Sequence, residues 1–359
     1  MSKLAVVHGP LAPVDLVVLE NAGFLVTTSP TSSTFFCQPG ETLLRAGLAA
    51  GLAMPYECAS GSCGTCRVRL LQGEVDCLWP QASGLSERDR AKGDRILCCQ
   101  SVALSACTIQ IQPGPNMTQS RVPRQWSAEV QERRSLNKNV QHITLRIDSA
   151  NFGDQEFLAG QFMLFELGPG IGRRAYSMAN MPNGTGCLEF VIKVKPGGSA
   201  SPVLFALEVG AKIQLEGPYG QAYFRAGSDR PLVAIAGGSG LGPMLSIIQA
   251  ALAHGGDSMV QLFFGVNEGD DLFFNEEISA LEQRYESLRV HRVVLHPKSS
   301  DPPDFQTGTV GDAALRIVGN LSDYDVYMAG PPAMINAVLK DTVLAGHALA
   351  ERVFFDSFN

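Results

Sequence analysis

The sequence lacks an excess of positive charge and any long apolar run. It has 28 Lys and Arg against 35 Asp and Glu, a net charge of −7 at pH 7. A chain without a basic surface is a poor partner for nucleic acid or for an anionic membrane. No segment has the roughly eighteen uninterrupted apolar residues that a membrane span needs. We therefore expect small molecules or proteins as partners, and no membrane association.

Several motifs are also missing. The six histidines are scattered, and there is no Ser/His/Asp arrangement or H-E-x-x-H motif, so nothing indicates hydrolytic chemistry. The N-terminal apolar run is broken early by His8, Gly9 and Pro10 and makes a poor signal peptide. An odd number of cysteines, nine, does not fit a disulfide framework. We expect a cytoplasmic protein with reduced thiols.

What the sequence does have is a concentration of cysteines in one loop. Cys58, Cys63 and Cys66 have C-x4-C-x2-C spacing, and the adjacent Cys98 and Cys99 follow downstream. This is the ligand spacing of a plant-type [2Fe–2S] cluster, in which four thiolates hold two irons. The intervening residues are small, which lets backbone N–H groups approach the sulfurs.

Two questions about this loop stay open from the residues alone. Zinc is an alternative to the cluster, although zinc sites usually show two separated C-x2-C pairs. The fourth ligand is either Cys98 or Cys99. Adjacent side chains of an extended segment point in opposite directions, so only one of the two can face the metal.

The chain divides into segments of different composition. Residues 1 to 20 form an N-terminal extension, 21 to 113 contain the cysteine loop, and 114 to 123 have the Pro- and Gly-rich composition of a linker. Residues 124 to 226 show short strand-like runs, typical of a small antiparallel barrel. Residues 227 to 359 alternate apolar strands and helices, which predicts a parallel sheet covered on both faces.

Three loops in the second and third segments combine residues that suit phosphate or flavin binding. An apolar strand at 232–236 runs into Gly237-Gly-Ser-Gly-Leu-Gly-Pro243 and then into a helix, where dinucleotide phosphates bind on backbone N–H groups. Lys195-Pro-Gly-Gly-Ser-Ala-Ser201 also precedes a helical stretch, and Gly172-Arg-Arg-Ala-Tyr-Ser177 joins two cations, an aromatic ring and a hydroxyl. Each alone is equally consistent with a plain turn or a surface charge pair, and the first loop departs from G-x-G-x-x-G.

Taken in order, these motifs resemble the ferredoxin-fused members of the ferredoxin–NADP reductase superfamily, the reductase components of bacterial multicomponent oxygenases. The resemblance covers residues 21 to 359. Besides the motifs above it rests on Cys99-Gln100, Gly217-Pro-Tyr-Gly220, Gly265-Val-Asn267, Gly330-Pro-Pro-Ala-Met334 and Phe354-Phe-Asp-Ser-Phe358. Tyr56-Glu-Cys58 and Leu78-Trp-Pro80 are most similar to reductases of toluene-type diiron monooxygenases.

The resemblance implies a multidomain fold, α+β and α/β. Its parts are a β-grasp [2Fe–2S] ferredoxin domain, an antiparallel β-barrel FAD domain and a doubly wound parallel-sheet NAD domain. The resemblance also implies the cluster ligands, because the family places Gln directly after the last cysteine. They are Cys58, Cys63, Cys66 and Cys99.

For FAD, the resemblance implies that Arg174 pairs with the pyrophosphate, Tyr176 stacks on the isoalloxazine and Ser177 hydrogen-bonds near flavin N5. The remaining implied FAD contacts are Ala175, Ile192, Lys193, Gly198, Ser199 and Ser201. Ser177 is also an implied catalytic residue.

For NADH, the resemblance implies contacts from two glycine loops, the one after the first parallel strand and the one that precedes the last helix. The implied residues are Gly238, Ser239, Gly240, Pro243, Asn267, Gly330 and Pro331. Phe358 would cover the flavin until the nicotinamide displaces it, with Asp356 as a polar partner and Phe355 as a rival cover. Phe358 and Asp356 are therefore implied catalytic residues.

Two departures from the family pattern carry weight. The family usually has Cys where this chain has Ala329, a position associated with nicotinamide orientation. After Asn267 come Glu268, Asp270 and Asp271, where an NADPH-binding loop would have cations for the 2′-phosphate. The acids predict NADH as the electron donor.

The predicted function is that of an NADH-dependent reductase that passes electrons through FAD and a [2Fe–2S] cluster to the oxygenase component of an aromatic hydrocarbon monooxygenase. NADH gives up two electrons as a hydride and the cluster accepts one at a time, which explains the flavin between them. One alternative is the reductase of a Rieske-type dioxygenase, with a small Rieske ferredoxin as acceptor. Another, of a different class, is an iron–sulfur sensing module without turnover, which only Ala329 suggests.

Overall fold

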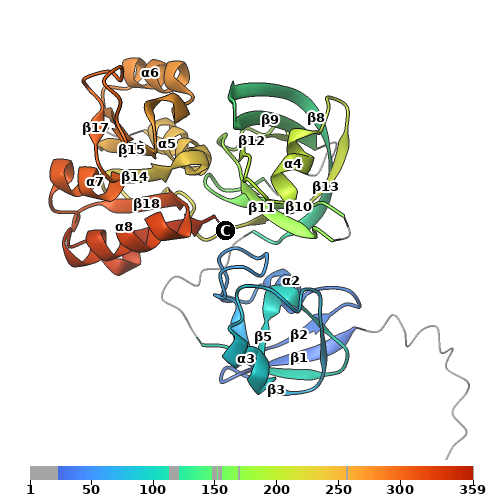
Figure 1. Cartoon of the computed structure of the whole chain (residues 1–359). Helices are drawn as coiled ribbons and strands as arrows, with labels where there is room; N and C mark the ends of the chain where they lie inside the picture. Colours follow the sequence, from blue (N-terminus) through green and yellow to red (C-terminus); the bar gives the residue numbers. More distant parts are fainter. Residues whose placement is uncertain are drawn as a thin grey trace, which may run out of the picture.

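The computed structural model describes residues 23–112, 121–147, 152, 156–168, 170–255 and 258–358. The predicted N-terminal extension and most of the predicted linker, 114 to 123, lie outside these residues. The described chain forms three lobes in sequence order, with the first lobe against the other two (Figure 1). No helix among the described residues is long and apolar enough to cross a membrane.

The first lobe has the β-grasp fold that the family resemblance implied. Its five-stranded sheet has the order β2-β1-β7-β3-β5, with β1 and β7 parallel and the other pairs antiparallel. A second small sheet pairs β4 with β6. The strands are β1 (Phe24–Ser29), β2 (Thr34–Cys37), β3 (Arg67–Gln72), β4 (Val75–Cys77), β5 (Arg95–Leu97), β6 (Ser101–Ala103) and β7 (Cys107–Gln110).

Helix α2 (Leu43–Ala49) begins where its cap residue allows. The Thr42 side chain accepts a hydrogen bond from the Arg45 N–H at 3.3 Å, which satisfies one of the donors that a helix start leaves free. The charged residues 86 to 95 include a helix, α3 (Glu87–Lys92), capped by Ser86 and ended by Gly93. The serine cap and the left-handed glycine were the signals for it.

The second lobe is a six-stranded antiparallel sheet of order β11-β10-β13-β8-β9-β12. Its strands are β8 (Arg124–Asn137), β9 (Val140–Ile147), β10 (Phe162–Glu166), β11 (Arg173–Ser177), β12 (Cys187–Lys193) and β13 (Lys212–Tyr219), with one helix, α4 (Ala200–Phe205). Alternate residues of β9, Ile143, Leu145 and Ile147, are buried, as expected for a strand with one face on a core. The sequence reading did not identify β11 as a strand, because its five residues are all half-buried and show no alternation.

The third lobe is an all-parallel sheet of order β17-β16-β15-β14-β18-β19. Its strands are β14 (Leu232–Gly237), β15 (Val260–Val266), β16 (Leu288–Val294), β17 (Gln306–Thr307), β18 (Asp325–Gly330) and β19 (Val353–Ser357). Its helices are α5 (Leu241–His254), α6 (Asn275–Arg284), α7 (Val310–Val318) and α8 (Pro332–Leu344). The strand order reverses at β14, so this is the predicted doubly wound sheet.

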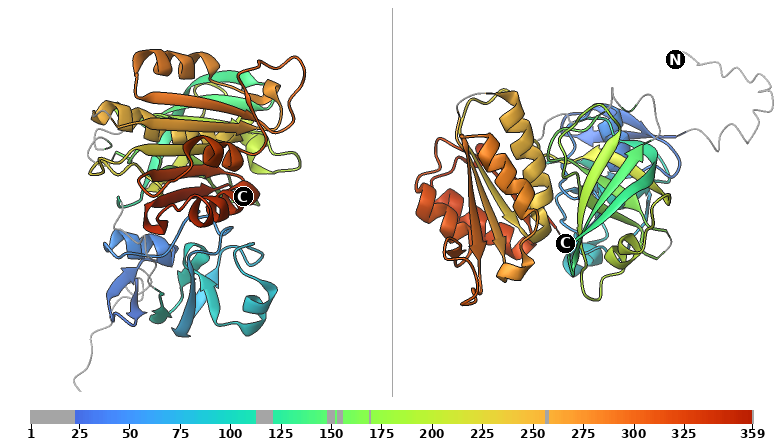
Figure 2. Two further views of the ribbon diagram at one scale, coloured as in Figure 1. Left: turned by 90° about the vertical axis from the view of Figure 1, so that its left-hand side faces the viewer. Right: turned by 90° about the horizontal axis from the view of Figure 1, so that it is seen from above.

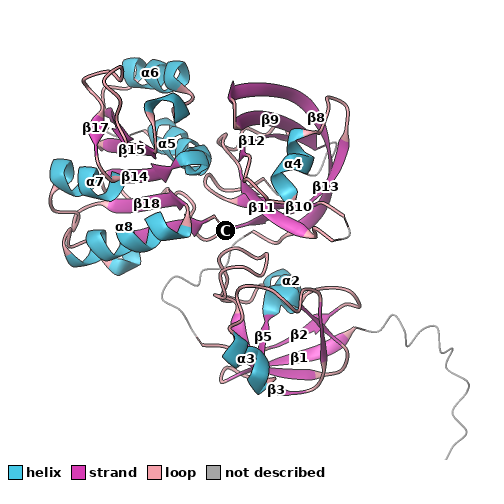
Figure 3. Cartoon of the chain, in the orientation of Figure 1, coloured by secondary structure: helices cyan, strands magenta, loops and turns pink. Residues whose placement is uncertain are grey.

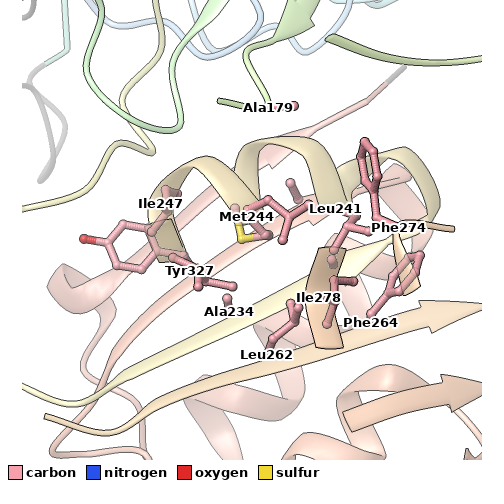
Figure 4. Packing of buried hydrophobic residues seen from close by; sticks show 14 of the residues in the cluster. Ala179, Ala234, Leu241, Met244, Ile247, Leu262, Phe264, Phe274, Ile278 and Tyr327 are labelled. Carbon is pink, nitrogen blue, oxygen red and sulfur yellow. The ribbon is translucent and has the colours of Figure 1, made fainter. Parts of the chain in front are cut away.

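Helices cover both faces of this parallel sheet (Figure 2). On one face, Leu241 and Met244 of α5 pack against Ala234 and Leu262 of the sheet, and Ile278 of α6 joins the same cluster (Figure 4). On the other face, α7 and α8 contribute alanine, isoleucine and valine side chains to a second cluster. Burial on both faces explains why these strands read as continuous apolar runs.

The three lobes lie next to one another (Figure 3), and their apolar clusters share residues at the boundaries between them. Phe162, Leu164 and Tyr219 of the barrel belong to the apolar cluster of the ferredoxin lobe. Ala179 and Val191 of the barrel belong to the cluster around α5. The barrel therefore fixes the positions of the other two lobes through apolar contacts.

Candidate functional site

The four predicted cluster cysteines come together as two facing pairs. The Cys63 N–H donates to the Cys58 sulfur at 3.4 Å, and the Cys66 and Cys99 sulfurs lie 3.2 Å apart. The Thr65 N–H donates to the Cys63 sulfur at 3.4 Å. Donation from the Cys63 thiol lowers the pKa of Cys58, and the same hydrogen bond raises the pKa of Cys63. The two backbone N–H donors favour negative charge on sulfur, as a thiolate-bound cluster requires.

Two glycines allow the loop to wrap this closely. Gly61 and Gly64 have φ of +93° and +79°, a region that residues with a side chain rarely adopt. A Cβ on Gly64 would lie 2.6 Å from the carbonyl oxygen of Gly84, and one on Gly61 would lie 2.9 Å from the Gln100 side chain. The thiols, the inward N–H donors and the bare backbone fit a [2Fe–2S] cluster.

The structure also separates Cys98 from Cys99. Cys98 is fully buried in the lobe's core, where burial raises its pKa well above the usual value, while Cys99 faces Cys66. Among the described residues, no three His, Cys, Asp or Glu side chains converge so as to hold a single metal ion. Two pairs of thiols suit two irons better than one zinc. The geometry supports Cys99 as the fourth ligand.

The implied flavin residues lie on β11, at the edge of the barrel. The Tyr176 ring meets Phe165 edge-on at 5.1 Å, and burial raises its pKa to about 12, so the phenol stays neutral. Ser177 ends the strand opposite Phe162. Arg174 donates to the Arg173 carbonyl at 2.8 Å. Ala175, which lies between Arg174 and Tyr176 on β11, packs against the core of the ferredoxin lobe.

The Arg174 guanidinium also lies over the ring of Trp79, 5.3 Å from its centre. Trp79 belongs to the ferredoxin lobe, and its ring lies against Gly61 of the cysteine loop. The sequence reading did not anticipate this contact, because nothing in either segment indicates that the two meet. It joins a proposed flavin ligand to the loop of the cluster.

The small-residue loop before α4 forms a tight turn. The Gly198 N–H donates to the Lys195 carbonyl and the Lys195 N–H donates to the Ser201 hydroxyl, both at 2.9 Å. Ser199 caps α4 without a side-chain hydrogen bond. Backbone donors at this short helix start face the loop, which fits the phosphate role implied for Gly198 and its neighbours.

The two implied residues at the end of β12 differ in placement. Ile192 is fully buried in the barrel core, so only its backbone is available to a cofactor. Lys193 is exposed, and its Nζ lies 3.8 Å from the position that a Cβ on Gly238 would take. Lys193 therefore reaches the glycine loop of the third lobe and adds a positive charge beside it.

The glycine loop of the third lobe lies where the sheet order reverses. It forms a single short turn, η3 (Gly238–Gly240), between β14 and α5, with Ser239 inside it and Pro243 in the first turn of α5. A Cβ on Gly240 would lie 2.0 Å from the carbonyl oxygen of Ala329. This close approach leaves backbone N–H groups bare at a helix start and at the switch point, where a dinucleotide pyrophosphate fits.

The loop after β15 carries the residues implied to select the nucleotide. The Asn267 carbonyl accepts from the His296 N–H at 2.8 Å, which joins this loop to the end of β16. Lys298 Nζ lies 2.8 Å from Glu268 and 2.9 Å from Asp270. Hydrogen bonds from Lys298 lower the pKa of both acids. Both carboxylates therefore pair with Lys298, and Lys138 adds a second positive charge nearby.

The C-terminal strand lies between the Gly330 loop, at the end of β18, and the cysteine loop. β19, not expected as a strand, pairs Asp356 with Ala329 and Ser357 with Gly330. The Phe358 N–H donates to the Gly330 carbonyl at 2.9 Å, and Pro331 directly precedes α8. Phe358 packs against the α5 cluster, whereas Phe355 packs against the α7 and α8 cluster.

Asp356 is buried between these loops. It is 6% exposed, and its Oδ2 has no hydrogen-bond partner. Burial, followed by the nearby Glu57 and Cys58, raises its pKa well above the usual value. Burial raises the pKa of Glu57, one residue before Cys58, to about 7, and the Thr65 hydroxyl and the nearby backbone of Ser357 oppose this shift. No local pattern predicts that Glu57 lies near Asp356, since this depends on how the lobes are placed.

Comparison with known families gives three matches, one for each lobe. Residues 26–104 match the 2Fe-2S iron-sulfur cluster binding domain, 127–224 the oxidoreductase FAD-binding domain, and 234–340 the oxidoreductase NAD-binding domain. The predicted cofactors, FAD, a [2Fe–2S] cluster and NAD, are thereby confirmed, as is the fold class.

Similar proteins match over nearly their whole length. The ferredoxin–NAD(+) reductase component of an alkene monooxygenase system from Xanthobacter autotrophicus is 45% identical, over 90% of this chain and 98% of that protein. The ferredoxin–NAD(P)(+) reductase CarAd of Metapseudomonas resinovorans is 38% identical, over 90% and 96%. The solved structure of the ferredoxin reductase in carbazole 1,9a-dioxygenase has a TM-score of 0.81 at 33% identity, over 94% and 98%.

These matches bear out the predicted family, the oxidoreductase activity and the kind of partner. The chain has an iron–sulfur, an FAD-binding and an NAD-binding domain in that order, and the thiol pairs, β11 and the glycine loop lie within the first, second and third matched ranges. The protein belongs to the family of ferredoxin–NAD(P)+ reductases that serve as the reductase components of oxygenase systems.

Proposed function

We propose that this chain is the NADH-dependent reductase of a bacterial hydrocarbon monooxygenase, located in the cytoplasm. The observation that carries the proposal is the placement of β19. Phe358, the residue after this strand, donates its N–H to Gly330 at the end of β18, and Asp356 and Ser357 of the strand lie near Glu57 of the cysteine loop. The proposed nucleotide site and the cysteine loop therefore lie close together, and β11, the strand with the proposed flavin residues, lies beside them (Figure 1).

The bound cofactors would supply the redox chemistry, and the protein would supply their binding and orientation. When bound, the flavin takes a hydride from NADH and the cluster takes electrons singly. The protein's own residues bind and orient these groups. We assign the cluster to Cys58, Cys63, Cys66 and Cys99, whose loop supplies inward N–H donors.

On the flavin side, we assign Arg174 to the pyrophosphate, because a planar cation matches phosphate oxygens. Tyr176 offers a flat neutral ring, and Ser177 offers a hydroxyl at the end of β11. The loop of Gly198, Ser199 and Ser201 supplies further donors. Ala175 and Ile192 supply backbone contacts, and Lys193 faces the glycine loop from the barrel side.

On the nucleotide side, the backbone of Gly238, Ser239 and Gly240 holds the pyrophosphate, with Pro243 fixing the start of α5. Asn267 and the acids after it select NADH. Buried Asp356 and the packed Phe358 exclude water at the end of β19. Gly330, the last residue of β18, and Pro331, which precedes α8, form the backbone beside the end of β19.

The monooxygenase assignment is supported by the 45% identity to the alkene monooxygenase reductase component. A second candidate, the reductase of a dioxygenase system, is supported by the carbazole 1,9a-dioxygenase reductase structure at 33% identity. The proposed cytoplasmic location agrees with nine cysteines that are all free.

Reconstitution tests the assignment. The purified holoprotein is mixed with NADH and either an alkene or aromatic monooxygenase hydroxylase, or a Rieske ferredoxin with its dioxygenase. We expect NADH consumption to be coupled to product formation with the monooxygenase. Coupling only in the dioxygenase mixture would transfer the assignment to the second candidate. No NADH-dependent reduction of cytochrome c or ferricyanide would contradict both.

A further inference from the structure

The ferredoxin lobe contacts the flavin barrel at a buried carboxylate, Glu216 of β13. This residue is 4% exposed. Arg173 Nη1 donates to both of its carboxylate oxygens at 3.2 Å, and the Tyr219 hydroxyl donates to Oε1 at 2.5 Å. Burial alone would lower the pKa of Arg173, but Glu216 and Glu166 outweigh it and raise the pKa. These partners all come from the barrel.

One further partner comes from the ferredoxin lobe. Arg45 of α2 places its Nε 3.8 Å from Glu216 and 3.7 Å from Glu41 of its own lobe. This Nε is shielded from solvent and has no hydrogen-bond partner, while the Arg45 side chain as a whole is 26% exposed. Separating the lobes would take Arg45 away from the buried Glu216, and removing a cation from a buried carboxylate is unfavourable.

The same junction continues into the cysteine loop. The Tyr219 ring stacks on Phe162 at 5.9 Å and meets the ring of Tyr56, from the ferredoxin lobe, edge-on at 6.0 Å. The Gly220 N–H donates to the Tyr56 hydroxyl at 3.2 Å. Tyr56 lies two positions before Cys58. The carboxylate is therefore connected to the cluster loop by a short chain of contacts.

We propose that Glu216 and Arg45 are positioning residues that hold the cluster-bearing lobe on the barrel, in the placement that lets electrons pass from flavin to cluster. This inference rests on the proposed function. Neither residue touches a cofactor site assigned above. Their effect therefore falls on transfer between lobes, while NADH binding and flavin reduction are untouched.

Two electron acceptors separate these steps. One NADH reduces two ferricyanide ions or two ferric cytochrome c molecules, giving NAD+ and one proton. We expect ferricyanide to take electrons at the level of the flavin and cytochrome c to take them after the cluster, and Cys99→Ser, described in the Discussion, checks this division. The ratio of the two rates therefore measures transfer between the lobes.

The test uses the holoprotein and the variant Arg45→Met, with Arg69→Met as the matched control. Arg69 pairs with Asp94 at 2.7 Å within the ferredoxin lobe, away from the barrel. For Arg45→Met we expect cytochrome c reduction to fall about tenfold, since misplacing reacting groups by about 1 Å can cost about a hundredfold. Ferricyanide reduction should be unchanged, and Arg69→Met should alter neither rate.

A readout independent of turnover is amide hydrogen exchange. Exchange at residues 54–58 and at Gly220 should accelerate in Arg45→Met and stay as in the wild type in Arg69→Met. Small-angle scattering should show a larger radius of gyration for Arg45→Met. The barrel-side variant Glu216→Gln keeps an acceptor for Tyr219, and should give the same changes in both rates and in exchange.

The double variant sharpens the result. If Arg45 and Glu216 act through each other, the double variant should be no slower with cytochrome c than the worse single variant. If Arg45→Met and Glu216→Gln both show the same amide exchange and the same cytochrome c rate as the wild type, the proposal is overturned. An equal fall in the rates with ferricyanide and with cytochrome c would also overturn the proposal, because it would show that Glu216 stabilises the flavin site. Failure of the wild type to oxidise NADH would instead overturn the proposed function.

Discussion

The cysteine loop and the glycine loop of the nucleotide lobe are both rich in small residues, but they use them differently. In the cysteine loop, Gly61 and Gly64 have positive φ, and the ligating atoms belong to side chains. In the glycine loop after β14, Gly238 also has a positive φ of +55°, but Gly240 has an ordinary φ of −59° and must be glycine because the end of β18 lies against it. One loop works through side chains and the other through bare backbone.

The largest expected effect comes from removing a side chain of the cysteine loop. Cys99→Ser should lose bound iron, the visible absorption of the cluster and NADH-driven cytochrome c reduction, because the cluster requires four thiolates. Ferricyanide reduction should remain. Iron analysis and absorption spectra check this.

The adjacent Cys98 provides the control. Cys98→Ala should keep its iron and its cytochrome c activity, at the cost of a small cavity in the core. Loss of iron in Cys98→Ala with retention in Cys99→Ser would exchange the two assignments. That result would also break the comparison, because the loop geometry around Cys66 would then not identify the ligand.

The next effect comes from adding a single carbon to the nucleotide loop. Gly240→Ala would place its Cβ 2.0 Å from the Ala329 carbonyl oxygen. We expect a destabilisation of about 1–3 kcal/mol from overpacking and a raised KM for NADH. Thermal unfolding and steady-state kinetics measure the two effects.

Gly242→Ala is the matched control, two positions along. Its Cβ would lie 3.5 Å from Ala179 and Val191, which is ordinary contact. Because alanine favours helices over glycine by about 1 kcal/mol, this change should be neutral or stabilising. If Gly240→Ala and Gly242→Ala behave alike, close approach is not the reason for glycine at position 240.

The smallest expected effect is on nucleotide preference, and it comes from the charged side chains of the loop after β15. Replacing both acids, Glu268→Gln with Asp270→Asn, frees Lys298 for a 2′-phosphate. We expect the NADPH/NADH ratio of kcat/KM to rise about tenfold, equivalent to about 1.4 kcal/mol. A double variant of two exposed acids elsewhere in the lobe, Glu276→Gln with Asp312→Asn, should leave the ratio unchanged.

The sign of the pKa shifts adds a pH test to this comparison. Lys298 lowers the pKa of both acids, and they raise its pKa in turn. All three groups therefore stay charged from about pH 6 to about pH 8, since ordinary carboxyl and lysine values already lie outside that range. The wild-type preference for NADH should be constant across it. A preference that fades within this range would exclude the three charges as its cause.

Local pattern was enough to predict much of this molecule. The alternation of apolar strands and helices predicted for residues 227 to 359 is confirmed by β14, β15, β16 and β18 and by α5 to α8, because burial on both faces leaves a strong apolar signal. Spacing predicted the cluster loop but left Cys98 and Cys99 open. The packing of Cys98 in the core, a tertiary fact, is what separates them.

The sequence could not predict what depends on lobe placement. β11 and β19 are strands because of their neighbours, and their own residues lack a clear alternation. The contacts of Arg174 with Trp79 and of Glu57 with Ser357 join segments far apart in the chain. No local pattern signals such contacts, since neither partner is unusual in its own segment.

Anaerobic titration of the purified holoprotein with NADH tests the central claim most directly. Electrons should enter through the flavin and reach the cluster within the same chain. Flavin absorbance should bleach, and the electron paramagnetic resonance signal of a reduced [2Fe–2S] cluster should appear without any added carrier. Bleaching without the cluster signal, or a protein that holds neither flavin nor iron, would contradict the account.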